Sequence, residues 1–181
     1  MSENKVTKRI INYPIGFEPN YILPDEYQPY RFAIGKLGKK PLVAICMNPS
    51  AARENTSDST VNRIIGYSEK LSYDGWVIFN TYPERATDAA NMESFNKALN
   101  DSNLETIKNF IMENEVKEVL GAWGDLKYDS LTTGKNAIME MLKKLDVKVF
   151  HFGTLTNQGN PRHPLQRQEK WEISKENKNY Y

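Results

Sequence analysis

Cysteine and histidine are scarce in this sequence, which has one cysteine and two histidines in 181 residues. The single thiol, Cys46, cannot form an intramolecular disulfide, and no cysteine and histidine residues have the spacing of a metal site. We therefore expect no metal site, and we also expect no organic cofactor. A chain so poor in cysteine is typical of the reducing cytoplasm, which is the expected compartment.

Long apolar runs are absent as well. No stretch approaches the roughly 20 apolar residues of a membrane span, and no apolar core follows the charged segment 1–9 as it would in a cleavable signal. Charge of one sign is not in excess either, because 24 basic against 23 acidic residues leave a net charge of +1. Bulk charge therefore gives no case for nucleic-acid binding, although a local basic groove stays open.

One globular domain is expected, because 39% hydrophobic and 26% charged residues in a chain of this length suit a single sizeable core. We divide it into an N-terminal wrapping arm over 1–40 that belongs to the same domain, an α/β body over 41–170 and a polar tail over 171–181. Prolines and aromatic residues predict an irregular arm with one short strand near 30–34.

The body is organised around the stretch from Leu42 to Arg63. Leu42–Met47 is a continuous apolar run, as in a strand buried on both faces. Asn48-Pro49-Ser50 ends this strand, since proline cannot donate to a ladder and Asn and Ser favour turns. Asp58 and Ser59 can then cap a helix. The apolar face of that helix reads Val61, Ile64, Ile65, Ser68 and Leu71.

Further strands and helices follow in alternation. The strands are expected at 76–79, 119–122 and 147–152. One helix is expected from a capping box at Ser102 and Glu105, another over about 133–145, and a short one near Trp171. This alternation predicts a three-layer α/β/α fold with a four-stranded, mainly parallel sheet.

Polar residues stand where the predicted strands end. In a parallel sheet the carboxyl ends of the strands meet at one rim, and α/β proteins place their ligands there. Asn48, Asn80 and Trp123 would lie on this rim, together with the loop that holds His163. The sequence therefore predicts a ligand site at this edge of the sheet.

The sequence also resembles two known groups of proteins. The segments MNPSAA, SDSTVNR, FNTYPERATD, GAWG and GNPRHPL resemble an uncharacterised family of bacterial and phage proteins, from Tyr30 to Leu165. That resemblance implies no activity. The order of the strand-end motifs is also similar to the uracil-DNA glycosylase superfamily, which has a G-x-D/N-P loop, a strand ending in Asn, a strand ending in W-G and a late H-P loop. This second resemblance implies a uracil-DNA glycosylase-like fold.

The glycosylase resemblance implies a role for each matching residue. Asn48 falls where an Asp or Asn positions the attacking water. Asn80 falls where an amide reads the base edge, and His163 where a histidine stabilises charge on the departing base. Leu165 falls near the wedge that such enzymes insert into a duplex. The resemblance thus implies that Asn48 and His163 are catalytic and that Asn80 binds substrate.

A second polar set surrounds the start of the first helix. Asp58, Thr60 and Arg63 have two interpretations: a helix cap beside a surface arginine, or an anion site in which the helix amino end and Arg63 hold a phosphate. Arg85 and Arg162 would join such an anion site. The two interpretations stay open at the level of sequence.

Three further residues complete the predicted substrate-binding set. Ser50 belongs to the polar loop after the first buried strand. Trp123 either stacks on a base or packs in the core. Gly124 would let a ligand or another backbone segment approach closely.

These observations favour a glycosidic-bond hydrolase, an N-glycosylase that acts on a nucleobase in DNA or in a nucleotide. The alternative is a non-catalytic protein that binds and sequesters a nucleotide or modified base, in a phage or host-defence setting. The balanced charge favours the alternative, as does Cys46-Met47-Asn48-Pro49, which lacks the glycine of the glycosylase loop. A third interpretation is a protein-interaction module, which predicts an exposed apolar patch. The oligomeric state stays open.

Overall fold

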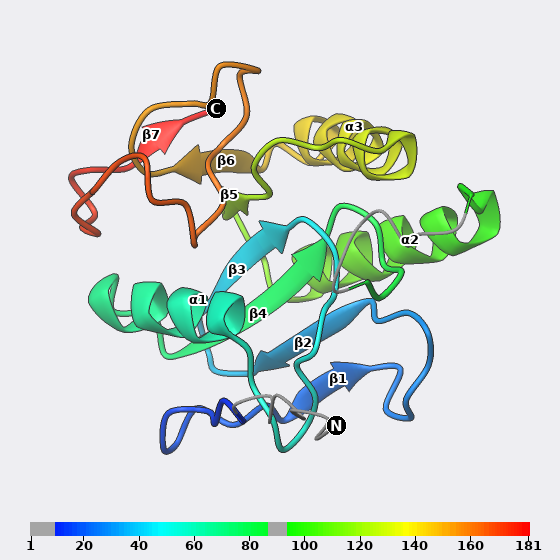
Figure 1. The fold of residues 1–181 in the computed structure, drawn as a ribbon, viewed down its shortest axis with the longest axis horizontal. Helices are drawn as coiled ribbons and strands as arrows, with labels where there is room; N and C mark the ends of the chain where they lie inside the picture. The colour runs from blue at the N-terminus through cyan, green and yellow to red at the C-terminus, as the bar shows by residue number, and fades with distance from the viewer. Residues whose placement is uncertain (1–9, 87–93) are drawn as a thin grey trace, which may run out of the picture.

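The computed structural model describes residues 10–86 and 94–181, and within them a seven-stranded sheet is flanked by three helices (Figure 1). The strand order is β1-β2-β4-β3-β5-β6-β7. The strands are β1 (Tyr21–Leu23), β2 (Ala33–Lys36), β3 (Pro41–Cys46), β4 (Gly75–Asn80), β5 (Glu118–Ala122), β6 (Lys148–His151) and β7 (Asn179–Tyr180). The helices are α1 (Ser59–Lys70), α2 (Lys97–Glu113) and α3 (Asp129–Lys144).

The α/β class is confirmed, but the expected four-stranded, mainly parallel sheet is wrong in its width and its pairing. The four predicted strands do form a parallel centre in the order β4-β3-β5-β6. The N-terminal arm adds β2 and β1 as antiparallel strands beside β4, and β7 pairs antiparallel with β6. The sequence predicted one short strand in the arm near 30–34, which overlaps β2, but it missed β1 and β7 because they have three and two residues, too few to show an alternating pattern.

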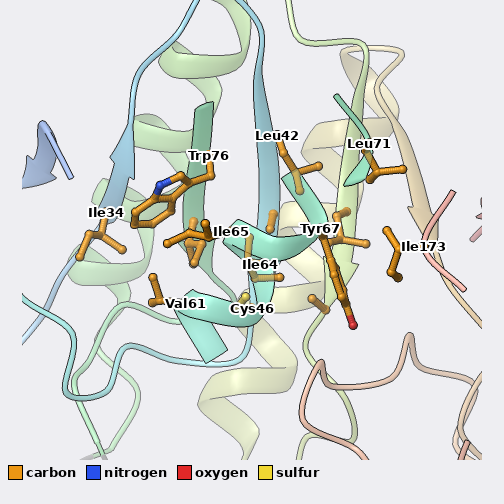
Figure 2. Close-up of a cluster of buried hydrophobic side chains, with 14 of the residues drawn as sticks. Ile34, Leu42, Cys46, Val61, Ile64, Ile65, Tyr67, Leu71, Trp76 and Ile173 are labelled. Atoms are coloured by element: carbon orange, nitrogen blue, oxygen red, sulfur yellow. The ribbon is translucent and has the colours of Figure 1, made fainter. Parts of the chain in front are cut away.

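Side chains of the central strands alternate between two cores on opposite faces of the sheet. On one face, α1 places Val61, Ile64 and Ile65 over Trp76 and Cys46 (Figure 2). On the other face, α2 and α3 cover Val43, Ile45, Val77 and Phe79. Burial raises the pKa of the Cys46 thiol to about 12, so it stays protonated and packs as a small apolar group.

Helix α1 begins where the sequence predicts. Asp58 is its N-cap, and one carboxylate oxygen accepts the N–H of Val61 at 2.8 Å. Helix α2 begins earlier than expected, with Asn96 as its N-cap. Ser102 and Glu105 therefore lie inside the helix and form no capping box. Asn is as good an N-cap as Ser, so the local pattern alone did not choose between them.

Helix α3 begins at Asp129 rather than near Thr133. The short helix expected near Trp171 does not form. The Trp171 indole instead donates to the hydroxyl of Tyr67 at 3.2 Å, and the segment beyond it runs on to become β7. Contacts with α1 and the sheet therefore hold this end of the chain. Within the described ranges, none of the helices has both the length and the apolar composition needed to cross a bilayer.

Candidate functional site

A cavity of about 230 Å³ lies at the carboxyl ends of β3 and β4, against the N-terminus of α1. It is lined by Arg31, Cys46, Met47, Asn48, Ser50, Asp58, Thr60, Val61, Ile78, Asn80, Ala86 and His163. The predicted site residues that it brings together are Asn48, Ser50, Asp58, Thr60, Asn80 and His163. Their elements meet here because parallel neighbours end at the same rim and the loop after β6 returns to it.

Asn80 is the last residue of β4 and pairs in register with Cys46 of β3. Its main-chain carbonyl accepts a hydrogen bond from the side chain of Asn103 in α2, at 3.0 Å. The Asn80 side chain is 1% exposed, and its carbonyl oxygen Oδ1 has no hydrogen-bond partner among the described residues. A buried acceptor without a partner is destabilising, so a ligand that donates to Oδ1 would complete this site.

Asn48 follows β3, and the surrounding backbone fixes its amide. The Nδ2 group donates to the carbonyl oxygens of Pro49 at 3.1 Å and Ala86 at 2.8 Å. Both amide protons are thereby directed at backbone, so the Oδ1 oxygen is the atom with capacity to accept from a ligand or a water. The same two bonds explain why an asparagine suits a structural role at this turn.

His163 lies in the loop that follows β6. Its Nδ1 accepts the main-chain N–H of Leu165 at 3.2 Å, so in the neutral ring the proton is on Nε2. Burial lowers the pKa of His163, and the nearby carboxylate of Asp58 opposes this effect only partly. The ring is therefore neutral at pH 7 and offers one N–H donor.

Gly124 does not line the cavity but backs the His163 loop. Its φ is +68°, and a Cβ at this position would lie 3.0 Å from the Cβ of His163. The Gly124 N–H also donates to the carbonyl of Pro161 at 2.9 Å. The close approach that the sequence predicted here is thus made by backbone and by His163. A second cleft of about 390 Å³, lined by Gly124, Asp125, Arg162 and others, shares His163 with the cavity.

The remaining predicted arginines do not join the cavity. Arg63 lines a separate cleft with Tyr67 and Trp171. Arg162 donates to the Thr154 carbonyl oxygen at 3.0 Å and forms an ion pair with Glu169 at 3.4 Å. Arg63 and Arg162 therefore line different clefts, and neither lines the cavity at the start of α1.

Two other predicted residues have structural environments. Trp123 is fully buried, and its indole N–H donates to Asn160 at 3.2 Å, so it packs in the core. Arg85 donates to the carbonyl oxygens of Ser50 at 3.2 Å and Gln28 at 3.1 Å. Arg85 thereby fixes the loop that carries Ser50 to the cavity.

Arg31 is a charged cavity residue that the sequence did not reveal. It precedes β2, is 2% exposed and lines the cavity, and its buried Nε–H has no partner among the described residues. Its only sequence signal is its position between Tyr30 and Phe32 in an aromatic run. The charge is buried because β2 pairs with β4, and no local sequence pattern predicted that pairing.

Fold and site together define an α/β protein with a small, polar, partly buried pocket at the end of its parallel strands. No group of three or more His, Cys, Asp or Glu side chains in residues 10–86 and 94–181 is arranged to hold a metal. The chain belongs to the family DUF1643, a protein family of unknown function, whose model matches residues 31–165. The match includes every residue that lines the cavity. Searches of curated proteins and of solved structures found no match.

Proposed function

We propose that the cavity encloses a nucleobase and that the protein hydrolyses the N-glycosidic bond joining this base to its sugar, in DNA or in a nucleotide. The observation that carries the proposal is the convergence of Asn48, Asn80 and His163 on one cavity. They come from the ends of β3 and β4 and from the loop after β6. The parallel centre of the sheet supports a uracil-DNA glycosylase-like arrangement for these strand ends.

The size of the cavity supports a single base. Pockets for drug-sized ligands span roughly 300–1,000 Å³, and this one holds about 230 Å³. A base would be enclosed, while its sugar and phosphate would lie outside. The adjoining polar cleft that shares His163 offers a place for them.

In the proposed reaction, the bond between the sugar carbon and the base nitrogen breaks, and its electron pair goes to the base. A water held by Oδ1 of Asn48 forms the new bond to the sugar carbon. The neutral His163 donates Nε2–H toward the departing base, and Oδ1 of Asn80 accepts from the base edge. The proton of the water ends on the base, so the products are a sugar hydroxyl and a free base.

A non-catalytic pocket that sequesters a nucleotide or modified base is the second candidate. It is favoured by the Asn48 amide, whose two bonds to the backbone at Pro49 and Ala86 suffice to explain an asparagine here. In that case Asn80 and His163 would recognise a base without any reaction. Turnover distinguishes the two functions.

The test is mass spectrometry of purified protein with uracil-, hypoxanthine- and mismatch-containing DNA and with free nucleotides. Released base and protein-bound ligand are measured in the same samples. For the enzyme, Asn48→Ala and His163→Ala should release base about 100- to 1,000-fold more slowly, as when one stabilising donor is lost. Asn55→Ala is the matched control, because Asn55 is an exposed asparagine outside the cavity.

Intact nucleotide retained without turnover would instead establish the sequestering function. A panel in which no base is released and nothing is retained would overturn both. Retained activity in His163→Ala would remove His163 from the reaction even if base is released.

A further inference from the structure

Arg31 is a buried cation with unused hydrogen-bonding capacity. Its Nη1 donates to the carbonyl oxygen of Ala52 at 2.7 Å, while Nε has no partner among the described residues. The side chain is 2% exposed and lines the cavity. Burying a guanidinium is unfavourable unless it is paired, so the arrangement favours the binding of an opposite charge.

No carboxylate within the described part of the chain forms an ion pair with Arg31. Burial lowers the pKa of Arg31 to about 10, with a smaller contribution from the like charge of Arg85, and the group stays cationic at neutral pH. Among the described residues, Asp58 is the acidic residue in the cavity lining, and its carboxylate already accepts the N–H of Val61 in the first turn of α1.

Among the other described groups around the cavity, only Asp58 opposes this positive charge, and it does so without forming an ion pair. The Cys46 thiol stays protonated, and the His163 ring is neutral at pH 7. Thr60 and Val61 bring the amino end of α1, which carries partial positive charge, to the same cavity. Within the described part of the chain, the Arg31 guanidinium and the N-terminus of α1 thus have one carboxylate, that of Asp58, beside them.

We infer that the cavity prefers a planar heterocycle carrying negative charge, with Arg31 Nε–H as the donor to its charged atom. The inference rests on the base-sized ligand of the proposed function, but not on its hydrolysis. It assigns Arg31 to the binding of the anionic form of the base. Because charge-assisted hydrogen bonds are roughly twice as strong as neutral ones, the preference should be large.

The experiment compares two rings of nearly the same shape by isothermal titration calorimetry at pH 7.5. Barbiturate is anionic at this pH, and uracil is neutral. We expect wild-type protein to bind barbiturate at least about tenfold more tightly than uracil. Inorganic phosphate, as an anion without a ring, should bind more weakly than barbiturate.

Variants of Arg31 test whether this residue causes the preference for barbiturate. Arg31→Gln should lose the preference for barbiturate, and Arg31→Lys should retain part of it, because lysine keeps the charge but not the planar fork. Arg53→Gln should behave as wild type, since Arg53 is an exposed arginine of a neighbouring loop that stacks on Tyr27 at 4.2 Å. If Arg31→Gln does not fold, Arg31→Lys and the wild-type comparison decide.

Equal affinity of the wild type for uracil and barbiturate would overturn the inference, as would phosphate binding as tightly as barbiturate. A preference unchanged in Arg31→Gln would also overturn it. Failure of the proposed hydrolysis would give a different result. Absence of released base alongside an Arg31-dependent preference for barbiturate would remove the reaction and leave the anion-selective cavity standing.

Discussion

Arg31 and Arg85 donate to the same main-chain oxygen, the carbonyl of Ala52, at 2.7 and 3.3 Å. Two like charges are thereby held side by side, and the charge of Arg85 adds to the burial that lowers the pKa of Arg31. Arg85 bonds Ser50 and Gln28 as well. The pair therefore joins the N-terminal arm to the loops after β3 and β4, at the cavity.

Arg85→Gln should destabilise the protein by about 1–3 kcal/mol, because hydrogen bonds from a charged donor to the carbonyls of Ser50 and Ala52 are lost. Urea unfolding measures the change. Arg53→Gln is again the control and should stay within about 0.5 kcal/mol of wild type, as exposed substitutions do. Equal stabilities of the two variants would show that the carbonyl contacts of Arg85 contribute nothing.

Alanine substitutions of Asn103 and Asn80, at the end of β4, should differ in their effects on stability and on ligand binding. Asn103→Ala removes the donor to the buried Asn80 carbonyl and should cost about 1–3 kcal/mol of unfolding free energy. Asn80→Ala removes an Oδ1 acceptor without a partner, so it should cost less than about 1 kcal/mol while abolishing ligand binding. Denaturant titration of both variants checks this order, and a reversed order would contradict it.

His163 should make stability fall in acid. Its pKa in the folded protein lies below the ordinary value of about 6.5, so the unfolded chain binds the proton more readily. The contribution of His163 to the free energy of unfolding is constant well above pH 6.5. It decreases as the pH falls below that value. Unfolding curves between pH 8 and 5 should therefore decline more steeply for wild type than for His163→Gln. Parallel curves would rule out this contribution.

Gly124→Ala should weaken both stability and ligand binding. The left-handed backbone conformation disfavours alanine by about 1–2 kcal/mol, and the new Cβ would press on His163. Gly159→Ala is a matched control, because its φ is +79° and nothing lies within 4 Å of a Cβ there. Chemical denaturation and barbiturate titration should show a shared backbone penalty but a binding defect only in Gly124→Ala.

The sequence predicted those features that local pattern determines. The buried run that became β3, the Asp58 cap and the parallel centre all have short-range signals, namely apolar continuity, capping residues and strand–helix alternation. The polar residues at strand ends were found for the same reason, since topology places them on one rim. Asn48, Asn80 and His163 needed no knowledge of side-chain packing to be proposed as neighbours.

What the sequence did not predict depends on long-range pairing. The arm folds back so that β2, which overlaps the strand expected near 30–34, pairs with β4; this pairing was not predicted, and neither were β1 and β7. Arg31 is buried as a consequence of that folding back. The capping box at Ser102 and Glu105 predicted a later start for α2 than the Asn96 cap that the structure has.

The matched family segment, residues 31–165, contains the cavity but neither β1 nor β7, the strands at the two borders of the sheet. The edge strands of the sheet meet a different physical requirement from the central strands. An exposed strand edge is a template for pairing with another chain, and very short edge strands limit this hazard. β1 and β7 have three and two residues, and neither strand contributes a residue to the lining of the cavity. Substitutions there should change solubility before they change what the cavity binds.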